Sequence, residues 1–180
     1  TVALDDVSFS VAQGEVRALI GENGAGKSTL VKILSGLIRQ DLGSVNLFGE
    51  TVAIGRPVRA HRLGIHTAFQ EMTLVGDLTV TQNMLLPYEP APVIGQIDRR
   101  KSRRLVAEHF AELSLDNVDP GALVSELDLS TRQKIEIAKA VSRKPRLLLL
   151  DEPTSTLSVS DVDWLGALIE KLSADGVTLV

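Results

Sequence analysis

The sequence contains no cysteine, which excludes disulfide bonds and every zinc site that needs thiolate ligands. It also has no apolar run near the roughly 20 residues that a membrane-spanning helix needs. The first residues, TVALDDVSFSV, lack the basic and then apolar layout of a secretory signal peptide. These absences favour a soluble cytosolic domain.

Positive charge is not in excess, because 23 acidic residues outnumber 19 Lys and Arg residues and give a net charge of -4. This balance argues against a general electrostatic affinity for nucleic acid or anionic membranes. The basic run RRKSRR at 99–104 has no interleaved aromatic residues, so we interpret it as a solvated helix face. His61, His66 and His109 show no metal-ligand spacing and are expected to be surface or packing residues.

The composition fits one sizeable α/β domain. The 180 residues are 44% hydrophobic and 23% charged, which is ordinary for a globular protein with a real core. The patterns predict strands at 7–11, 15–21, 64–69 and 146–151, a hairpin-like pair of short strands within 41–52, and helices near 28–37, 78–86, 99–113, 131–143 and 160–173.

Two of these segments carry finer predictions. Asp98 is expected to cap the helix at 99–113. The four consecutive leucines at 147–150 are typical of a strand that is buried on both faces of a parallel sheet. The residues expected on the apolar face of the helix at 99–113 are Leu105, Val106, His109, Phe110 and Leu113.

The octapeptide GENGAGKS at 21–28 matches the phosphate-loop pattern G-x-x-x-x-G-K-[ST] between a predicted strand and a predicted helix. Its glycines permit tight turns, so successive backbone N–H groups can point at phosphate oxygens. Lys27 brings a full charge to the β- and γ-phosphates, and the Ser28 hydroxyl can ligate Mg²⁺. The predicted nucleotide-binding residues are Gly21, Glu22, Asn23, Gly24, Ala25, Gly26, Lys27, Ser28 and Thr29.

Two carboxylates follow the predicted buried strand in RLLLLDE at 146–152. Open α/β sheets bind their ligands at the carboxyl ends of strands, so Asp151 is placed to hold Mg²⁺. Glu152 is placed to polarise an attacking water. A DEP tripeptide alone is weak evidence, but its position after LLLL and downstream of a phosphate loop makes the prediction strong.

These motifs together resemble the nucleotide-binding domain of an ATP-binding cassette (ABC) protein, and the likeness covers nearly the whole chain. GENGAGKST looks like the phosphate loop of that family, FQE at 69–71 like its glutamine loop, and LLLLDEPTS like its second nucleotide motif. Within the family, the stretches at 57–86, 97–104 and 135–157 are similar to the ATPases of bacterial monosaccharide importers of the ribose, galactose or xylose type.

The resemblance implies an α/β P-loop NTPase fold with a RecA-like parallel sheet flanked by helices. The ATPase core is expected at 1–71 and 134–180, with a short antiparallel β region at about 2–52 and an inserted helical subdomain at 72–133. The likeness also implies a fragment of a longer protein, the first of two tandem nucleotide domains. In the family, the aromatic residue that stacks on adenine and the switch histidine would then lie outside this chain.

The same resemblance implies an ATPase that binds and hydrolyses ATP with Mg²⁺ to power sugar import. Without the adenine-stacking aromatic residue and the switch histidine, the fragment itself is expected to bind ATP weakly and to hydrolyse it slowly or not at all. Glu152, Gln70 and Lys27 would be catalytic, and Ser28, Asp151 and Gln70 would hold the metal. The implied partners are a second nucleotide-binding domain paired head to tail, a transmembrane permease and, indirectly, a sugar-binding protein, with no nucleic acid. The implied location is the cytoplasmic face of the cell membrane, as a peripheral subunit.

The family signature LSGGQ aligns without a gap on Leu127, Asp128, Leu129, Ser130 and Thr131, and only the leucine is retained. A two-residue slip would match Leu129, Ser130 and Gln133 but would turn the following helix by about 200°. We prefer the gap-free register. Asp128 then adds negative charge and Leu129 adds bulk where the family signature contacts the partner's γ-phosphate, which predicts a weak opposite site. The aspartate that follows the family's catalytic glutamate aligns with Ser158.

Three other functions stay open on the sequence. A soluble ABC-type ATPase of translation or repair would share the motifs, although the stretch at 57–86 argues against it. A P-loop GTPase or small-molecule kinase would leave Gln70 unexplained, and no N/T-K-x-D guanine motif is present. An ATP-gated domain without turnover fits the altered signature, whereas the intact Glu152 counts against it.

Overall fold

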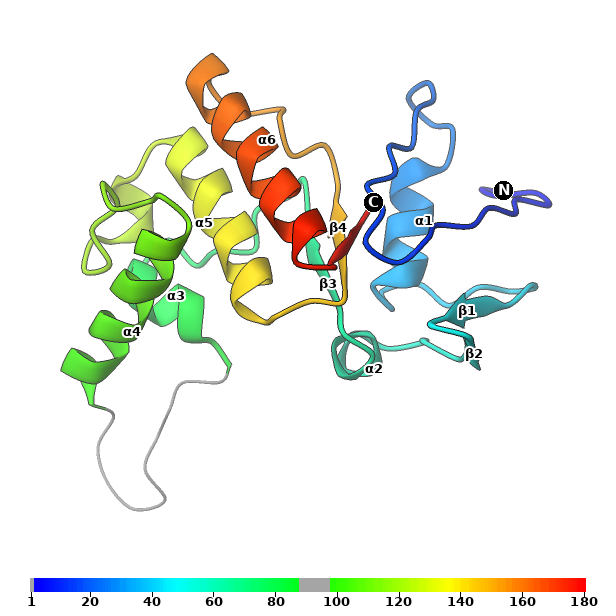
Figure 1. Cartoon of the computed structure of the whole chain (residues 1–180), viewed down its shortest axis with the longest axis horizontal. Coiled ribbons are helices and arrows are strands. Elements are labelled where there is room, and N and C mark those ends of the chain that lie inside the picture. The colour runs from blue at the N-terminus through cyan, green and yellow to red at the C-terminus, as the bar shows by residue number, and fades with distance from the viewer. Residues whose placement is uncertain (1, 88–97) are drawn as a thin grey trace.

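The computed structural model describes residues 2–87 and 98–180, and its core is a parallel sheet between two groups of helices (Figure 1). The sheet has the strand order β3 (Ile65–Ala68), β4 (Leu147–Leu150) and β5 (Thr178–Leu179). Ile65 pairs with Leu147, and Leu147 pairs in turn with Thr178. This is the parallel α/β arrangement that the sequence predicts.

Strand β4 is buried on both faces, as its four leucines predict. Leu148 belongs to the cluster formed with the helices α4 (Arg99–Glu112), α5 (Leu129–Ser142) and α6 (Val159–Ala174). Leu147 and Leu149 belong to a second cluster, formed with α1 (Lys27–Leu34) and α2 (Pro57–Arg62). The alternation follows from the two-residue period of a strand, which sends successive side chains to opposite faces.

A two-stranded antiparallel sheet lies beside α1, within the predicted β region. Val45 of β1 (Val45–Leu47) pairs with Val52 of β2 (Glu50–Val52). The intervening Phe48 and Gly49 have φ of 52° and 87°, the pair of positive angles that a tight hairpin turn requires. Most hairpins of this kind use Asn-Gly or Asp-Gly, so Phe48 adopts a conformation that its side chain does not favour.

Helix ends follow local capping chemistry. Asp98 caps α4 as predicted, since its side chain accepts hydrogen bonds from the backbone N–H groups of Arg100 and Lys101. Thr79 and Gln82 form a capping box at the start of α3 (Val80–Leu85). A short 3₁₀ turn at Val124–Glu126 leads into α5, which spans the predicted boundary at 133/134 as one continuous helix, so the proposed division into core and helical subdomain stays a prediction.

Two predicted strands near the N-terminus do not form. Residues 7–11 have no strand pairing, and of residues 15–21 only Val16 forms an isolated parallel bridge, to Leu179. The bridge is closed by hydrogen bonds of 2.9 Å between Leu179 and the backbone of Glu15 and Arg17. A strand needs a hydrogen-bonding neighbour as well as an apolar pattern, and within the described residues this bridge is the only pairing found for the two segments.

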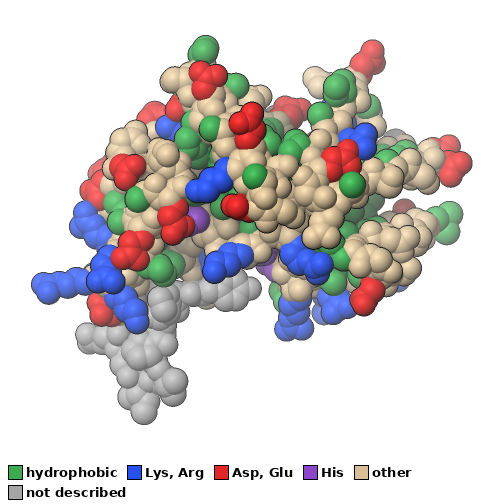
Figure 2. Space-filling model, viewed as in Figure 1, with side chains coloured by type: hydrophobic (Ala, Val, Ile, Leu, Met, Phe, Trp, Pro, Cys, Tyr) green, Lys and Arg blue, Asp and Glu red, His purple; other side chains and the backbone are tan. Residues whose placement is uncertain are grey.

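The apolar face of α4 is also narrower than predicted. Val106, Phe110 and Leu113 are buried, but Leu105 is 48% exposed. Ser102 is buried instead of Leu105. It lies on the same face of the helix as Val106 and Phe110, because residues four apart in a helix share a face. Figure 2 shows Lys and Arg side chains gathered over the N-terminal half of α4, and all the basic residues of 99–104 are exposed. No helix within the described residues is long and apolar enough to cross a bilayer.

Two of the three histidines stack against each other. The rings of His61 and His66 lie 4.8 Å apart at an angle of 10°. Burial, followed by the charges of His61 and Arg143, lowers the pKa of His66 to about 4. Burial and Arg143 also lower the pKa of His61. Among the described residues no cluster of three or more metal-ligating side chains occurs.

This pair makes stability depend on pH. The folded-state pKa of His66 lies below its unfolded value near 6.5, so the unfolded chain binds more protons and stability falls as the pH drops from about 6.5 toward 4. After discounting for partial solvent screening we expect a loss of about 1 kcal/mol, or ~2–4 °C in Tm, between pH 7 and pH 5. Thermal denaturation followed by circular dichroism at the two pH values measures this loss.

His66→Gln should remove most of that pH dependence. His61→Gln serves as the matched control and should remove a smaller share, because burial is the largest cause of the shift at His66 and persists in that variant. An equal pH dependence in His66→Gln and the parent chain would contradict the assignment.

Candidate functional site

The loop at 21–28 leads into α1 through two glycines with left-handed backbones. Gly24 and Gly26 have φ of 84° and 90°, values that L side chains rarely adopt. A Cβ at Gly26 would also lie 2.7 Å from the backbone oxygen of Ala3, so no larger residue fits. The loop thus ends in a fixed turn that sets the N-terminus of α1, where free backbone N–H groups and the helix dipole favour anions.

Lys27, the first residue of α1, folds back over the loop. Its Nζ donates hydrogen bonds to the carbonyl oxygens of Gly21 at 2.6 Å and Glu22 at 3.0 Å. The ammonium group of Lys27 therefore links the end of the loop back to its start. It places a full positive charge at the loop. The phosphate contact of Lys27 stays a prediction.

Asp151 links α1 to the end of β4. The Ser28 Oγ donates to the Asp151 Oδ1 at 3.3 Å, and the carboxylate is buried. A hydroxyl and a carboxylate are oxygen ligands of the kind that Mg²⁺ prefers, and they come from segments 123 residues apart in sequence. The donor set therefore fits Mg²⁺, with Ser28 and Asp151 as the residues that would hold it.

Glu152 and Gln70 meet because β3 and β4 are neighbours in the sheet. The Asp151 N–H donates to the Ala68 carbonyl oxygen at 3.1 Å, which aligns the ends of the two strands. Two residues past β3, the Gln70 Nε2 donates to the Glu152 Oε2 at 2.9 Å. Glu152 has φ of 48°, a left-handed value for a residue that carries a Cβ. Its backbone is held in an uncommon conformation at the residue predicted to act on water.

These side chains surround one cavity of about 350 Å³. Part of the phosphate loop lines it together with Gln70 and Glu152, whereas the predicted site residues Gly21, Glu22, Ala25 and Asp151 are not among its lining residues. Ala3 also lines it, and no pattern in the sequence indicated that contact. The lining residues are Ala3, Asn23, Gly24, Gly26, Lys27, Ser28, Thr29, Gln70 and Glu152.

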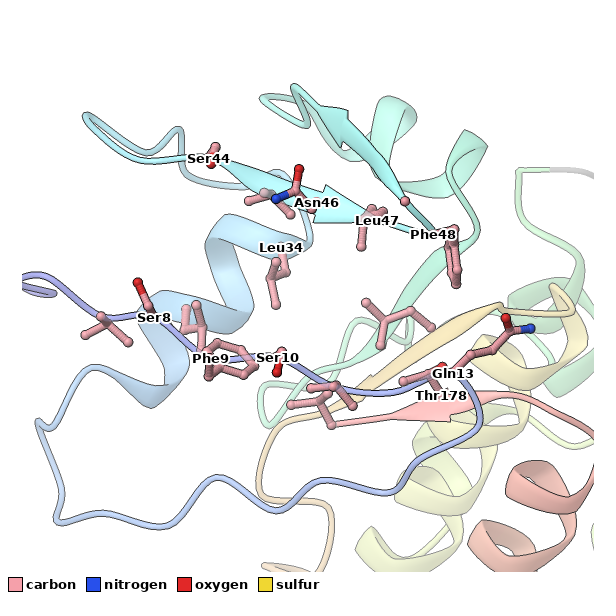
Figure 3. A pocket seen from close by; sticks show the side chains of 17 residues that line it. Ser8, Phe9, Ser10, Gln13, Leu34, Ser44, Asn46, Leu47, Phe48 and Thr178 are labelled. Atoms are coloured by element: carbon pink, nitrogen blue, oxygen red, sulfur yellow. The ribbon is translucent and has the colours of Figure 1, made fainter.

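A larger cavity, of about 650 Å³, lies elsewhere. Figure 3 shows it between the extended segment that carries Phe9, helix α1 with Leu34, and the β1–β2 turn with Phe48. Among the described residues, no charged side chain lines this cavity. A triphosphate needs positive charge and oriented N–H groups, so we place the candidate nucleotide site at the smaller cavity.

Comparison with known proteins decides the family. A family model described as ABC transporter matches residues 4–155 of this sequence. The chain belongs to the ABC transporter family.

Curated relatives of this ABC cassette are named as sugar importers. It is 44% identical over 179 residues to the ribose import ATP-binding protein RbsA 1 of Rhizobium johnstonii. It is 43% identical over 178 residues to the arabinose import ATP-binding protein AraG 1 of Burkholderia cenocepacia. Each alignment covers 99% of this chain but 35% of the relative, so the cassette spans about a third of the length of the relatives that it matches.

Solved structures confirm the fold. A nucleotide-free ATP-binding cassette from an ABC transporter superposes with a TM-score of 0.83 at 26% identity, covering 98% of this chain and 73% of that one. A dimeric cassette in a post-hydrolysis state, bound to ADP and phosphate, superposes with a TM-score of 0.84 at 24% identity and covers 99% of this chain and 78% of that one. The ABC cassette therefore has the P-loop NTPase fold that its motifs predict.

The altered signature segment of the cassette forms the start of α5. Asp128 is the N-cap, and its carboxylate accepts hydrogen bonds of 2.8 Å from both the backbone N–H and the hydroxyl of Thr131. These bonds lower the pKa of Asp128, so it carries a negative charge at neutral pH. Leu129 is 58% exposed, and Leu127 packs at the edge of the larger core cluster. None of the five predicted signature residues lines the 350 Å³ cavity.

Ser130 belongs to a polar cluster that was not predicted. Its hydroxyl donates to the Asp161 carboxylate, which also accepts from the Lys134 Nζ at 2.8 Å and the Ser158 Oγ at 2.7 Å. These bonds, led by that from Lys134, lower the pKa of Asp161. The cluster joins the start of α5 to the start of α6, and only the capping-box-like spacing of Ser158 and Asp161 signals it in the sequence.

Proposed function

We propose that this chain binds and hydrolyses ATP with Mg²⁺ to power sugar import through a membrane permease. The observation that carries the proposal is the convergence of Lys27, Ser28, Gln70 and Glu152 on one cavity. The names of the curated relatives, ribose and arabinose import ATP-binding proteins, supply the sugar-import part. The predicted role as the first of two tandem domains fits a chain that covers 35% of its relatives.

In this proposal, different residues of the chain bind the phosphates, hold the metal and act on the attacking water. Backbone N–H groups of the loop and the Lys27 ammonium bind the β- and γ-phosphates and stabilise the charge that develops in the transition state. Ser28, Asp151 and the side-chain amide oxygen of Gln70 would hold Mg²⁺. When bound, Mg²⁺ neutralises phosphate charge. Glu152 orients the attacking water and accepts its proton, and its hydrogen bond from Gln70 fixes one carboxylate oxygen.

The proposed partners are a second nucleotide-binding domain, a transmembrane permease and, through it, a sugar-binding protein. The proposed location is the cytoplasmic face of the membrane. In a head-to-tail pair, Asp128 would bring a negative charge toward the partner's γ-phosphate, so we propose that the opposite nucleotide site turns over weakly. The altered signature affects that site, whereas the lysine, aspartate and glutamate of the chain's own site are intact.

Lys27→Ala tests the nucleotide site directly. In the full-length protein we expect ATP affinity, measured by isothermal titration calorimetry, to fall at least 10-fold, because a charge-assisted contact to phosphate is lost. Lys32→Ala is the matched control, since Lys32 lies exposed at the other end of α1, outside the cavity lining, and should leave the affinity unchanged. Equal affinities in the two variants would argue against the site.

The transport role needs a separate experiment. The full-length protein, expressed with its neighbouring genes and extracted from membranes in detergent, should co-purify with a multi-span permease. A protein that never associates with the membrane would leave the ATPase chemistry standing and remove the transport role.

A further inference from the structure

Two buried polar side chains hold the segment that connects Gln70 to α3. Glu136 of α5 is 3% exposed and Asn83 of α3 is fully buried, and both bond to the backbone of residues 73–79. Thr73 and Val75, the residues that they hold, are themselves exposed at the surface. Buried side chains therefore hold this surface segment at two positions, Thr73 and Val75.

The Glu136 carboxylate makes both of its recorded contacts with one residue. Its Oε1 accepts from the Thr73 hydroxyl at 2.6 Å, and its Oε2 lies 3.3 Å from the Thr73 backbone N–H. No ion pair to Glu136 is recorded within the described residues. Its neighbours in the helix, Ile135 and Ile137, are fully buried core residues.

Stability alone does not account for this residue. A carboxylate in the interior is unfavourable unless its oxygens are well bonded, and an apolar side chain of similar size is often as stable or more so. Glu136 bonds to Thr73, three residues after Gln70. It therefore connects the middle of α5 to the segment that leads from the candidate site.

Asn83 secures the same segment two residues further on. Its Oδ1 accepts from the Val75 N–H at 2.8 Å, and its Nδ2 donates to the carbonyl oxygens of Val75, Leu78 and Thr79 at 3.0–3.3 Å. The amide therefore holds the Val75 backbone through both its N–H and its C=O. Between Gln70 and Thr73, neither Glu136 nor Asn83 bonds to the chain.

We infer that Glu136 is a positioning residue that sets the reach of Gln70 toward Glu152. Three residues span at most about 10 Å, so fixing Thr73 limits where the Gln70 backbone can lie. Gln70 in turn donates its 2.9 Å hydrogen bond to Glu152, on the wall of the nucleotide cavity. The inference rests on the proposed function, because it assigns Glu136 a role in turnover at that same site.

The test replaces Glu136 in the full-length protein and measures ATP turnover and ATP affinity separately. Glu136→Leu should lower kcat about 10-fold and leave ATP affinity within twofold, because the phosphate loop is not touched. Glu136→Gln keeps oxygen and nitrogen atoms within reach of Thr73 and should restore most of the rate. Glu170→Leu, the same replacement on the exposed face of α6, is the matched control and should match the parent protein.

A double-mutant comparison separates positioning from a general loss of structure. If Glu136 acts through Gln70, Glu136→Leu should add no further loss of kcat to Gln70→Ala, since interacting residues are not additive. Thr73→Val removes the hydroxyl from the surface side and should reproduce part of the effect even if Glu136→Leu folds poorly. Losses that multiply, or ATP affinity that falls together with kcat, would overturn the inference.

Amide hydrogen exchange gives a readout that does not depend on turnover. Residues 71–75 should exchange faster in Glu136→Leu than in the parent protein and Glu136→Gln, with no change in α1. Unchanged exchange at 71–75 would overturn the positioning role whatever the enzyme activity. Faster exchange in a protein that hydrolyses no ATP would support the anchoring and show that the proposed function itself had failed.

Discussion

Replacing Glu152 with glutamine is expected to lower the rate of ATP hydrolysis by about 100-fold, within the range that general acid–base groups contribute. The substitution keeps the size of the side chain and its place on the cavity wall but removes the carboxylate that we propose as the acceptor of the attacking water's proton. ATP affinity should be retained, because Lys27 and the loop are unchanged. Phosphate release from the full-length protein measures the rate, and calorimetry measures the affinity.

Glu71→Gln is the control for this substitution. Glu71 is exposed and lies one residue beyond Gln70, yet it is not part of the cavity lining. The same change of charge at that position should leave both rate and affinity close to those of the parent protein. A rate in Glu152→Gln equal to that of Glu71→Gln would contradict the role assigned to Glu152.

Replacing Gly36 with alanine is expected to destabilise the fold by about 3 kcal/mol. Gly36 lies two residues past the end of α1 with φ of +77°, and a Cβ there would lie 2.5 Å from the Arg56 carbonyl carbon and 2.6 Å from its oxygen. The left-handed backbone costs an alanine ~1 kcal/mol. Displacing a neighbouring backbone adds ~2 kcal/mol, the usual scale of overpacking. The expected fall in Tm is ~6–12 °C.

Gly49→Ala isolates the backbone part of that effect. Gly49 has φ of +87°, but a Cβ there would meet no atom within 4 Å. It should therefore lose only ~1 kcal/mol. Urea denaturation of the two variants measures the difference between them. Equal losses would show that Arg56 moves aside at little cost and that the close approach of α1 to α2 does not constrain the fold.

The predictable parts of the site are contiguous in sequence. The loop at 21–28 and the pair Asp151 and Glu152 carry their residue types at fixed spacing, and the strand or helix beside each one fixes its orientation. The resemblance implied a role for Gln70 and a role for Glu152, but not the hydrogen bond between them, which follows from the pairing of β3 with β4.

The parts that sequence could not predict depend on tertiary contacts between distant residues. Glu136 and Thr73 are 63 residues apart, and Lys134 and Asp161 are 27 apart. The residues on either side of each one in the sequence do not show whether its side chain is buried against a distant partner or exposed to solvent. The strands expected at 7–11 and 15–21 were wrong for a related reason, because an apolar pattern states what a segment buries but not whether a neighbour is present to accept its hydrogen bonds.

The left-handed backbone of Glu152 sets folding and chemistry against each other at a single position. Glycine there would relieve ~1 kcal/mol of backbone strain, so random substitution combined with selection for stability alone would drift toward it. If Glu152 acts on water as proposed, selection for turnover would act in the opposite direction and favour a carboxylate in that conformation. On that proposal, a glycine at this position would relieve the backbone at the expense of nucleotide hydrolysis, and would leave nucleotide binding to Lys27 and the loop.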